Sequence, residues 1–153
     1  MSEIIASHSL LIAPTVLGEA LWIYRDDERS EKVLINEGLI RELHPALQIA
    51  TISDAERALA IALTKEMDDG EAETLAIASL RTVRMCSDDH AALRVAPRVS
   101  VVTVTTLELL DAWASAQSQA RVRQALRSLR KRANYTAPRS HPLRDWFIRE
   151  SSE

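Results

Sequence analysis

Apolar positions along the chain follow two alternating periods, and these predict strands and helices in turn. Short apolar or β-branched runs at residues 10–13, 47–52, 83–86 and 99–104 predict strands. Apolar residues three and four apart predict amphipathic helices between them. The predicted helices span residues 15–24, 31–37, 53–67, 71–80, 88–96, 105–115 and 117–133. Strands that alternate with helices predict a parallel sheet flanked by helices.

Local signals mark several of the predicted helix ends. Ser53 with Glu56, and Thr105 with Glu108, have the spacing of capping boxes, in which each side chain bonds the other residue's backbone. Gly38 follows the segment 31–37 and is the residue type that most often ends a helix. These signals support helices that start after residues 53 and 105.

Length and composition narrow the class of protein. A chain of 153 residues with 46% apolar side chains can form one domain with a substantial core. No apolar run approaches the roughly 20 residues that cross a bilayer, and the start of the chain does not resemble a signal peptide. The single cysteine, Cys86, excludes an internal disulfide and reads as a buried strand residue. We therefore expect a cytoplasmic protein without a membrane segment.

Charge is distributed unevenly along the chain. Residues 1–120 carry ten basic and 19 acidic side chains, whereas residues 121–153 carry nine basic and three acidic ones. An acidic body with a basic tail suits a metal site beside a surface that binds a polyanion. The alternative is a solvated basic helix that packs on its own acidic fold. We expect an α/β core at residues 1–116 and a basic C-terminal helix and tail at residues 117–153.

Two acidic clusters stand at neighbouring junctions of strands and helices. Asp-Asp-Gly-Glu-Ala-Glu at residues 68–73 opens an alanine-rich helix, and Ser-Asp-Asp at residues 87–89 follows the next predicted strand. In open α/β sheets, ligands gather beyond the carboxyl ends of the strands. Converging carboxylates repel one another unless a cation lies between them, and hard divalent ions prefer oxygen ligands. The two clusters together predict a metal site.

Within each cluster, the spacing leaves the choice of acid open. Glu71 and Glu73 point roughly 200° apart on a helix, so only one can face a common site. The same question applies to Asp88 and Asp89, where the chain leaves a strand. Acids at helix starts also serve as ordinary caps, and Glu19, in the helix at 15–24, could simply face solvent. Caps alone do not explain two clusters at adjacent junctions.

Several segments resemble motifs of PIN-domain ribonucleases, the VapC-like toxin group. Asp-Gly-Glu-Ala-Glu at 69–73 resembles the family's Gly-Glu-Ala-Glu motif, and Ser-Asp-Asp at 87–89 resembles its Thr/Ser-x-Asp motif. The segment 14–20 is similar to Pro-x-x-Val-x-x-Glu, and 102–110 to the next strand and leucine-rich helix. Residues 36–40 stand where the family often has an x-x-Gly-x-Ile connection. The resemblance covers about residues 10–113.

This resemblance implies a PIN-like three-layer α/β/α fold with a mostly parallel central sheet. It also implies an acidic pocket for Mg²⁺ or Mn²⁺ and hydrolysis of RNA by a metal-activated water. Glu71, with Glu73 as the competing choice, would be the helix acid, and Ser87 would orient the water or a ligand. The catalytic residues carried over are Glu19, Glu71, Ser87, Asp88 and Asp89, and the metal ligands are Glu19, Glu71, Glu73, Asp88 and Asp89.

The resemblance further implies a metal-dependent endoribonuclease, a hydrolase, acting as the toxin half of a toxin–antitoxin pair with an antitoxin protein as partner. Family members begin with a strand that ends in Asp, upstream of the Pro-x-x-Val-x-x-Glu segment. This chain starts too close to Pro14 to contain it, with Ser7 superficially in the place of that Asp. The alternative is therefore an inactive, shortened module that binds RNA or a protein. Exposed sheet edges would also favour a homodimer or a partner strand.

The basic tail offers a second functional surface. Arg127, Arg130 and Lys131 have the spacing of one helix face, where they could contact RNA phosphates. Cations near a helix C-terminus also simply complement the helix dipole. Trp146 and Phe147 are expected to fold back onto the body as packing anchors.

Overall fold

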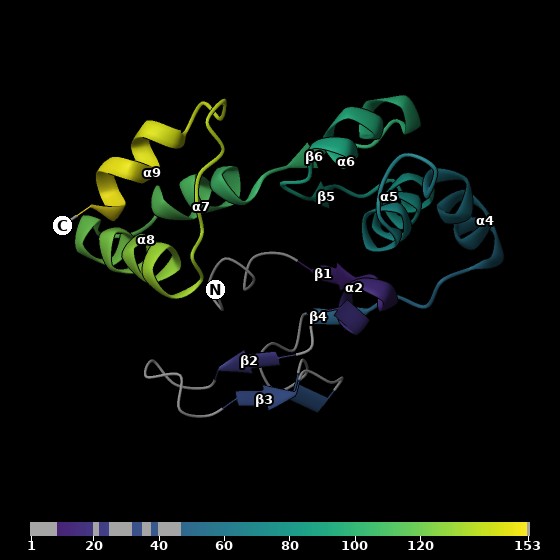
Figure 1. Cartoon of the computed structure of the whole chain (residues 1–153), viewed down its shortest axis with the longest axis horizontal. Coiled ribbons are helices and arrows are strands. Elements are labelled where there is room, and N and C mark those ends of the chain that lie inside the picture. The colour runs from purple at the N-terminus through teal and green to yellow at the C-terminus, as the bar shows by residue number, and fades with distance from the viewer. Residues whose placement is uncertain (1–8, 20–21, 25–31, 35–37, 40–46, 153) are drawn as a thin grey trace. The chain divides into compact units, whose positions relative to one another are not determined.

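The structure is a computed structural model that describes residues 9–19, 22–24, 32–34, 38–39 and 47–152 (Figure 1). Its chain divides into two compact units, residues 1–104 and 105–153, which are described separately below. Helix α7 (Thr106–Ala114) belongs to the second unit. The domain boundary predicted from the sequence lies twelve residues further on, after residue 116, and that division into domains stays a prediction.

The first unit contains two parallel strand pairs. Strand β1 (Leu10–Ile12) pairs with β4 (Leu47–Ile49), and β5 (Met85–Cys86) pairs with β6 (Thr103–Val104). Each lies within a predicted strand segment, although each is shorter than its apolar run. The two pairs are separate two-stranded sheets within the described residues. Parallel pairing directs the carboxyl ends of both strands in a pair to the same edge.

The segment after Pro14 corrects two predicted helices. Helix α2 (Pro14–Glu19) forms as expected, but β2 (Trp22–Tyr24) and β3 (Lys32–Leu34) are strands that pair antiparallel. The predictions of helix at residues 22–24 and at 32–34 were therefore wrong. Aromatic and β-branched residues suit a pleated strand, and cross-strand pairing outweighs a weak helical period. The expected connection at 36–40 lies outside the described residues except for Gly38 and Leu39.

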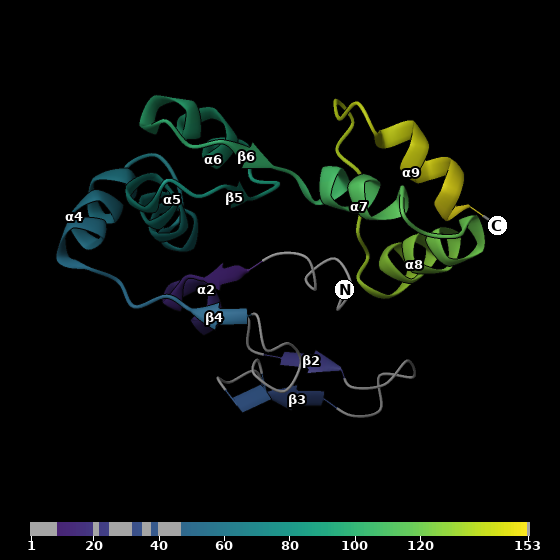
Figure 2. The ribbon, with the colours of Figure 1, turned by 180° about the vertical axis from the view of Figure 1, so that it is seen from behind.

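Helices α4 (Asp54–Leu63) and α5 (Asp69–Arg81) lie side by side, as Figures 1 and 2 show. The capping box at the start of α4 is confirmed: the Ser53 amide donates to the Glu56 carboxylate at 2.7 Å, and the Glu56 amide donates to the Ser53 hydroxyl at 3.3 Å. Between the two helices and the strands lies a core rich in small residues. It includes Ala60, Leu63, Met67, Ala72, Leu75, Ala76, Met85 and Val95.

An ion pair fastens the start of α4 to the end of α5. The Arg81 guanidinium donates to both oxygens of Glu56, at 2.6 and 3.1 Å, and to the Thr51 carbonyl at 2.8 Å. The Glu56 side chain is only 5% exposed and that of Arg81 is 31% exposed. The hydrogen bond from Arg81, together with that from the Ser53 backbone, lowers the pKa of Glu56 from 4.5 to about 2.

The chain beyond β5 forms α6 (His90–Val95), which continues into a 3₁₀ turn, η1 (Ala96–Val99). The helix ends at Val95, before Pro97, as predicted. Pro97 stands at the start of the 3₁₀ turn that follows, where its missing N–H costs no hydrogen bond. Val95 and Val101 are buried and join the core of the first unit.

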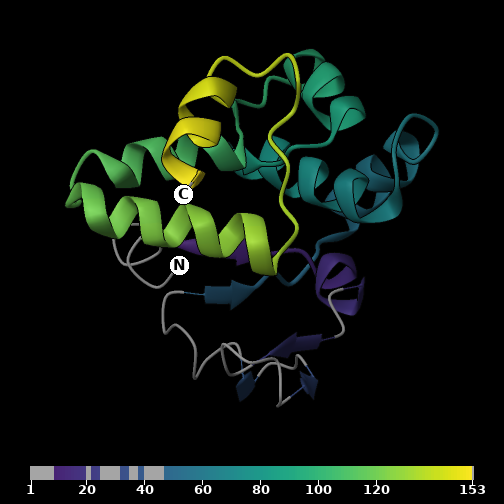
Figure 3. The same cartoon turned by 60° about the vertical axis from the view of Figure 1, so that its left-hand side comes forward.

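The second unit consists of α7, α8 (Gln119–Arg132) and α9 (Arg144–Ser151), with α9 packed along α8 (Figure 3). The Thr105 capping box at the start of α7 is confirmed. Phe147, 2% exposed, packs with Leu107, Val122 and Leu126, so the predicted packing anchor lies in the core of its own unit. Throughout the described ranges, none of the helices has the length and apolar character needed to cross a membrane.

The Glu56–Arg81 pair predicts acid-sensitive stability. Replacing Glu56 by Gln should lower the free energy of unfolding at pH 7 by about 2 kcal/mol, because a charged hydrogen bond network is lost. The folded-state pKa lies below the unfolded one, so the wild-type advantage should be complete above pH 4.5 and disappear as the pH falls towards 2.

Urea unfolding at a series of pH values measures this difference. The matched control is Asp54→Asn, which removes a neighbouring exposed carboxylate from the same helix turn. A loss for Glu56→Gln that is equally large at pH 2 and pH 7 would contradict the assignment.

Candidate functional site

A cavity of about 440 Å³ lies in the first unit, where the carboxyl ends of β1 and β5 meet the first turns of α5. Three of its lining residues are the acids Glu71, Asp88 and Asp89, and Ser87 lies among them. The structure thus brings both predicted acidic clusters to one cavity. The remaining lining residues are Leu11, Ile12, Ala13, Val16, Gly70, Thr74, Met85 and Cys86.

The start of α5 leaves room for the carboxylate of Glu19. A Cβ atom added to Gly70 would lie 3.1 and 3.2 Å from the two Glu19 carboxylate oxygens, and 3.3 Å from the Cγ2 atom of Val16. These distances are tighter than ordinary van der Waals contacts, so a side chain at position 70 would press on Glu19. Glycine before Glu71 therefore lets the Glu19 carboxylate lie against the first turn of α5. That position is favourable, because the amino end of a helix attracts negative charge.

The structure separates the roles of Glu71 and Glu73. The Glu73 carboxylate accepts a hydrogen bond from the backbone N–H of Thr15 at 2.9 Å. This N–H belongs to the first turn of α2, where helix geometry leaves it without an internal partner. Glu71 instead lines the cavity, and its carboxylate accepts no hydrogen bond from the described residues. Glu73 therefore fastens α2 to α5, and Glu71 is the helix acid that faces the cavity.

Asp88 and Asp89 both line the cavity, but Asp89 also has a structural role. Its carboxylate accepts the Ala92 N–H at 2.8 Å and so caps α6. Its own N–H donates to the Ser87 hydroxyl at 3.1 Å. The Ser87 N–H in turn donates to the Val104 carbonyl at 3.1 Å, which continues the pairing of β5 with β6. These bonds fix the turn that presents Asp88 to the cavity.

The charges around the cavity are of one sign. None of the lining residues that the structure describes is a lysine, arginine or histidine. Carboxylate and hydroxyl oxygens are the donors that Mg²⁺ and Mn²⁺ prefer, so the chemistry of the lining fits a hard divalent ion. The described side chains do not, however, include any group of three or more His, Cys, Asp or Glu residues that could hold a metal ion. The cavity therefore fits a divalent ion in the chemical type of its donor groups.

Two of the lining residues that the sequence did not predict for the site, Cys86 and Thr74, carry a thiol and a hydroxyl group. Cys86 was expected to be buried, but it is exposed and lines the cavity. Met85 takes the inward position of the short strand β5, and alternation along the strand turns Cys86 the other way. Thr74 lies one helical turn after Glu71, and this spacing could have identified it. Its hydroxyl donates to the Gly70 carbonyl at 2.8 Å.

The three basic residues predicted to bind RNA have different surroundings. The Arg127 guanidinium donates to the Ser152 carbonyl at 2.9 and 3.1 Å, just beyond the end of α9. Arg127 and Lys131 both line a hollow of about 490 Å³ along α8. Arg130 lies against a different cavity and is 3.4–3.5 Å from the hydroxyls of Ser151 and Ser152.

Parallel strands whose carboxyl ends meet a cavity of carboxylates define an α/β protein with its candidate ligand site at the carboxyl ends of those strands. A family model described as a PIN domain matches residues 6–142, so the chain belongs to the PIN-domain family. The PIN-like α/β/α fold predicted from the sequence is thereby confirmed. PIN domains are in general nucleases that use divalent metals. Comparison with curated proteins gave no match, and comparison with solved structures gave none either.

The different contacts of Glu71 and Glu73 predict unequal effects on stability. Glu73→Ala should lower the free energy of unfolding by about 1 kcal/mol, because the first turn of α2 loses its cap. Glu71→Ala should change it by less than about 0.5 kcal/mol, because that carboxylate accepts no hydrogen bond from the described residues. Urea denaturation of the two variants compares them directly, and equal losses would contradict this assignment.

Proposed function

We propose that this chain is a divalent-metal-dependent ribonuclease that hydrolyses RNA phosphodiester bonds. The observation that carries the proposal is the gathering of acids from separate elements at one cavity whose described lining has no basic side chain. Membership of a family of nucleases supports the reaction class, and it suggests RNA as the substrate. The toxin half of a toxin–antitoxin pair, with an antitoxin as partner, is the biological setting that the VapC-like motifs support.

Glu71 and Asp88 are the proposed principal ligands for Mg²⁺ or Mn²⁺, and Glu19, whose carboxylate lies against Gly70, is a further proposed ligand. Glu73 is proposed chiefly as a support, because its carboxylate already accepts a backbone N–H group, and Asp89 caps α6 as well as lining the cavity. This choice follows from geometry: a carboxylate that caps a helix has fewer lone pairs for a metal.

When bound, a divalent metal supplies positive charge that polarises the scissile phosphoryl group and makes a nearby water more acidic. The side chains then have separate tasks. Water oxygen attacks phosphorus, a phosphorus–oxygen ester bond breaks, and a carboxylate of Glu71 or Asp88 accepts the proton from the water. The Ser87 oxygen already accepts the Asp89 N–H, so its own proton can be donated to a phosphoryl oxygen. The departing oxygen takes a proton from solvent.

A second candidate function is a module that binds RNA or a protein without cutting. One observation favours it: in the described part of the chain, no three acids come close enough together to hold a metal ion. A binding module would need the acidic cavity only for its charge or shape. The two functions differ in whether divalent metal changes the substrate covalently.

Cleavage of a labelled structured RNA tests the nuclease proposal. The purified chain should cut with Mn²⁺ and not with EDTA. The double variant Glu71→Gln/Asp88→Asn should cut at least about 100-fold more slowly, which is the scale expected when groups that stabilise the transition state are removed.

The control variant is Asp54→Asn/Asp145→Asn, which removes two exposed carboxylates outside the cavity and should cut like the wild type. Folding of all proteins is checked by circular dichroism. Folded wild-type protein that cuts no faster than the double variant would refute the nuclease and favour the binding module.

The hollow on α8 is proposed as the surface that contacts the RNA backbone. Arg123, Arg127 and Lys131 line it at intervals of four residues, and no carboxylate is among its described lining residues. Arg127 and Lys131 come from the predicted set, and Arg123 is added by the structure. Its Nε atom donates to Glu150 at 3.1 Å.

Phosphate contacts release counterions, so binding should weaken steeply with salt. Lys131→Gln should weaken binding of single-stranded RNA and reduce the slope of log affinity against log salt by about 0.7. Filter binding in EDTA at several salt concentrations measures this slope. Lys65→Gln, in the first unit, is the charge-matched control, and an equal change in both variants would contradict a specific role for α8.

A further inference from the structure

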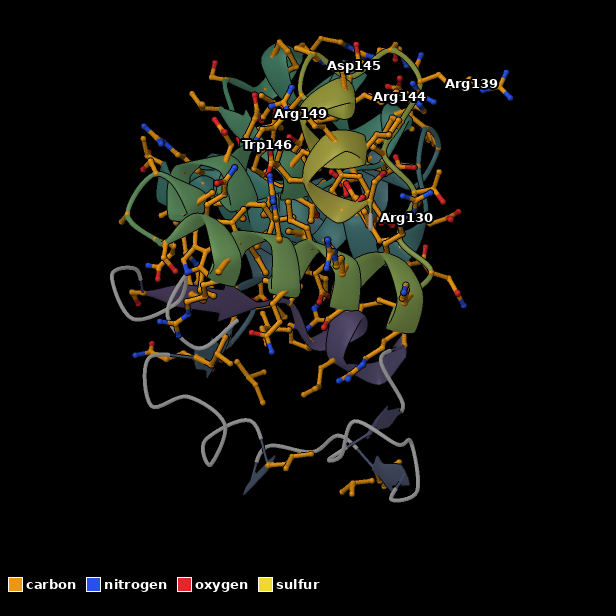
Figure 4. All side chains as sticks on the ribbon, turned by 90° about the vertical axis from the view of Figure 1, so that its left-hand side faces the viewer. Arg130, Arg139, Arg144, Asp145, Trp146 and Arg149 are labelled. Carbon is orange, nitrogen blue, oxygen red and sulfur yellow. The ribbon has the colours of Figure 1, made fainter. Side chains whose placement is uncertain are left out.

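A cavity of about 390 Å³ lies between the end of α8, the connection at 134–137 and α9. Arg130 lines it from α8, and Arg144 lines it from the first turn of α9. Figure 4 shows Arg130, Arg139 and Arg144 on one side of α9, whereas Trp146 and Arg149 lie on the other side. Two arginines from separate helices therefore line one cavity: Arg144 stands in the first turn of α9, and Arg130 contacts Ser151 and Ser152 near its end.

The wall of this cavity is held by aromatic packing. Phe147 is buried, and its ring meets that of Tyr135 edge-on, with centroids 5.4 Å apart and planes at 75°. Asn134 has a φ of 52°, a left-handed conformation that turns the chain out of α8 into the connection. The Asn134, Tyr135 and Thr136 side chains add an amide and two hydroxyl groups to the lining.

The charge of the cavity is positive and lacks a carboxylate among its described lining residues. Arg130 is close only to neutral hydroxyls, at 3.4 and 3.5 Å, among its described neighbours. The Arg144 Nη1 atom is 3.7 Å from the Oδ1 atom of Asp145, whose side chain is 93% exposed.

We propose that this cavity binds a phosphate monoester. A guanidinium group matches two oxygens of a phosphate, and this cavity has an arginine near each end of α9 that can do so. The volume is within the range of small-molecule sites and too small for a protein segment. A terminal phosphate on an RNA strand and a free nucleotide share this chemistry. The site lies in the second unit and does not depend on the nuclease proposal, because it involves none of the acids of the first unit.

Isothermal titration calorimetry of the full chain in EDTA tests the site, since EDTA removes any metal-dependent binding or cleavage. The probes are inorganic phosphate, adenosine 5′-monophosphate, and one short oligoribonucleotide prepared with and without a 5′-phosphate. The phosphorylated oligonucleotide should bind more tightly than its dephosphorylated form. Arg144→Gln and Arg130→Gln should each weaken phosphate binding about tenfold, because each removes a charged hydrogen bond.

Arg149→Gln is the matched control: it makes the same charge change on α9, on the opposite side, and should bind as the wild type does. Arg144→Lys should recover only part of the affinity, because lysine keeps the positive charge but lacks the paired N–H donors of the guanidinium group. Thermal melting confirms that each variant is folded. The proposal is overturned if phosphate does not bind, or if the control loses as much affinity as Arg144→Gln. If adenosine 5′-monophosphate binds as tightly as the 5′-phosphorylated RNA, a free nucleotide is a ligand of the site. If the 5′-phosphorylated RNA binds more tightly than the mononucleotide, the ligand is the end of an RNA strand.

Discussion

The hydrogen bond from the Thr15 N–H to the Glu73 carboxylate is the contact on which the candidate site depends. It joins the amino end of α2 to the side of α5, and so sets β1 and α2 beside the turns that carry Glu71. The close fit of Glu19 and Val16 over Gly70 needs the same approach of the two helices. Two wall segments that are almost 60 residues apart in sequence are thereby brought to one cavity. The Glu73 carboxylate thus stabilises the start of α2 and also positions the walls of the cavity.

The acidic residues divide between structure and chemistry. Glu56, Glu73 and Asp89 each accept backbone N–H groups at helix starts, and Glu56 also binds Arg81. Acids near helix starts are favourable in any protein, so the fold would keep these residues without a catalytic role. Glu71 differs, because its carboxylate faces a cavity of like charge and accepts no hydrogen bond from the described residues. A site built on such acids is costly unless a cation or another ligand compensates the charge.

The basic residues of the second unit divide in the same way. Arg123 and Arg127 connect α8 to α9 through Glu150 and the Ser152 carbonyl, so part of the positive charge holds the unit together. This supports the interpretation of the tail as a packed helix. It does not account for Arg130 and Arg144, whose cavity has no carboxylate in its described lining. Arg123 and Arg127 thus serve packing as well as the proposed RNA surface, whereas Arg130 and Arg144 line the proposed phosphate site.

The sequence by itself determined the features that depend on neighbouring residues. Both capping boxes, the four apolar strand segments and the two acidic clusters are encoded within a few positions, and the motif order indicated the PIN-domain family. Only the tertiary structure decided between Glu71 and Glu73, turned Cys86 outward and separated Arg130 from Arg127. The strands at 22–24 and 32–34 were missed for the same reason, since a strand forms only with its partner. Each of these outcomes is set by contacts between distant segments, and the local period of a sequence does not contain them.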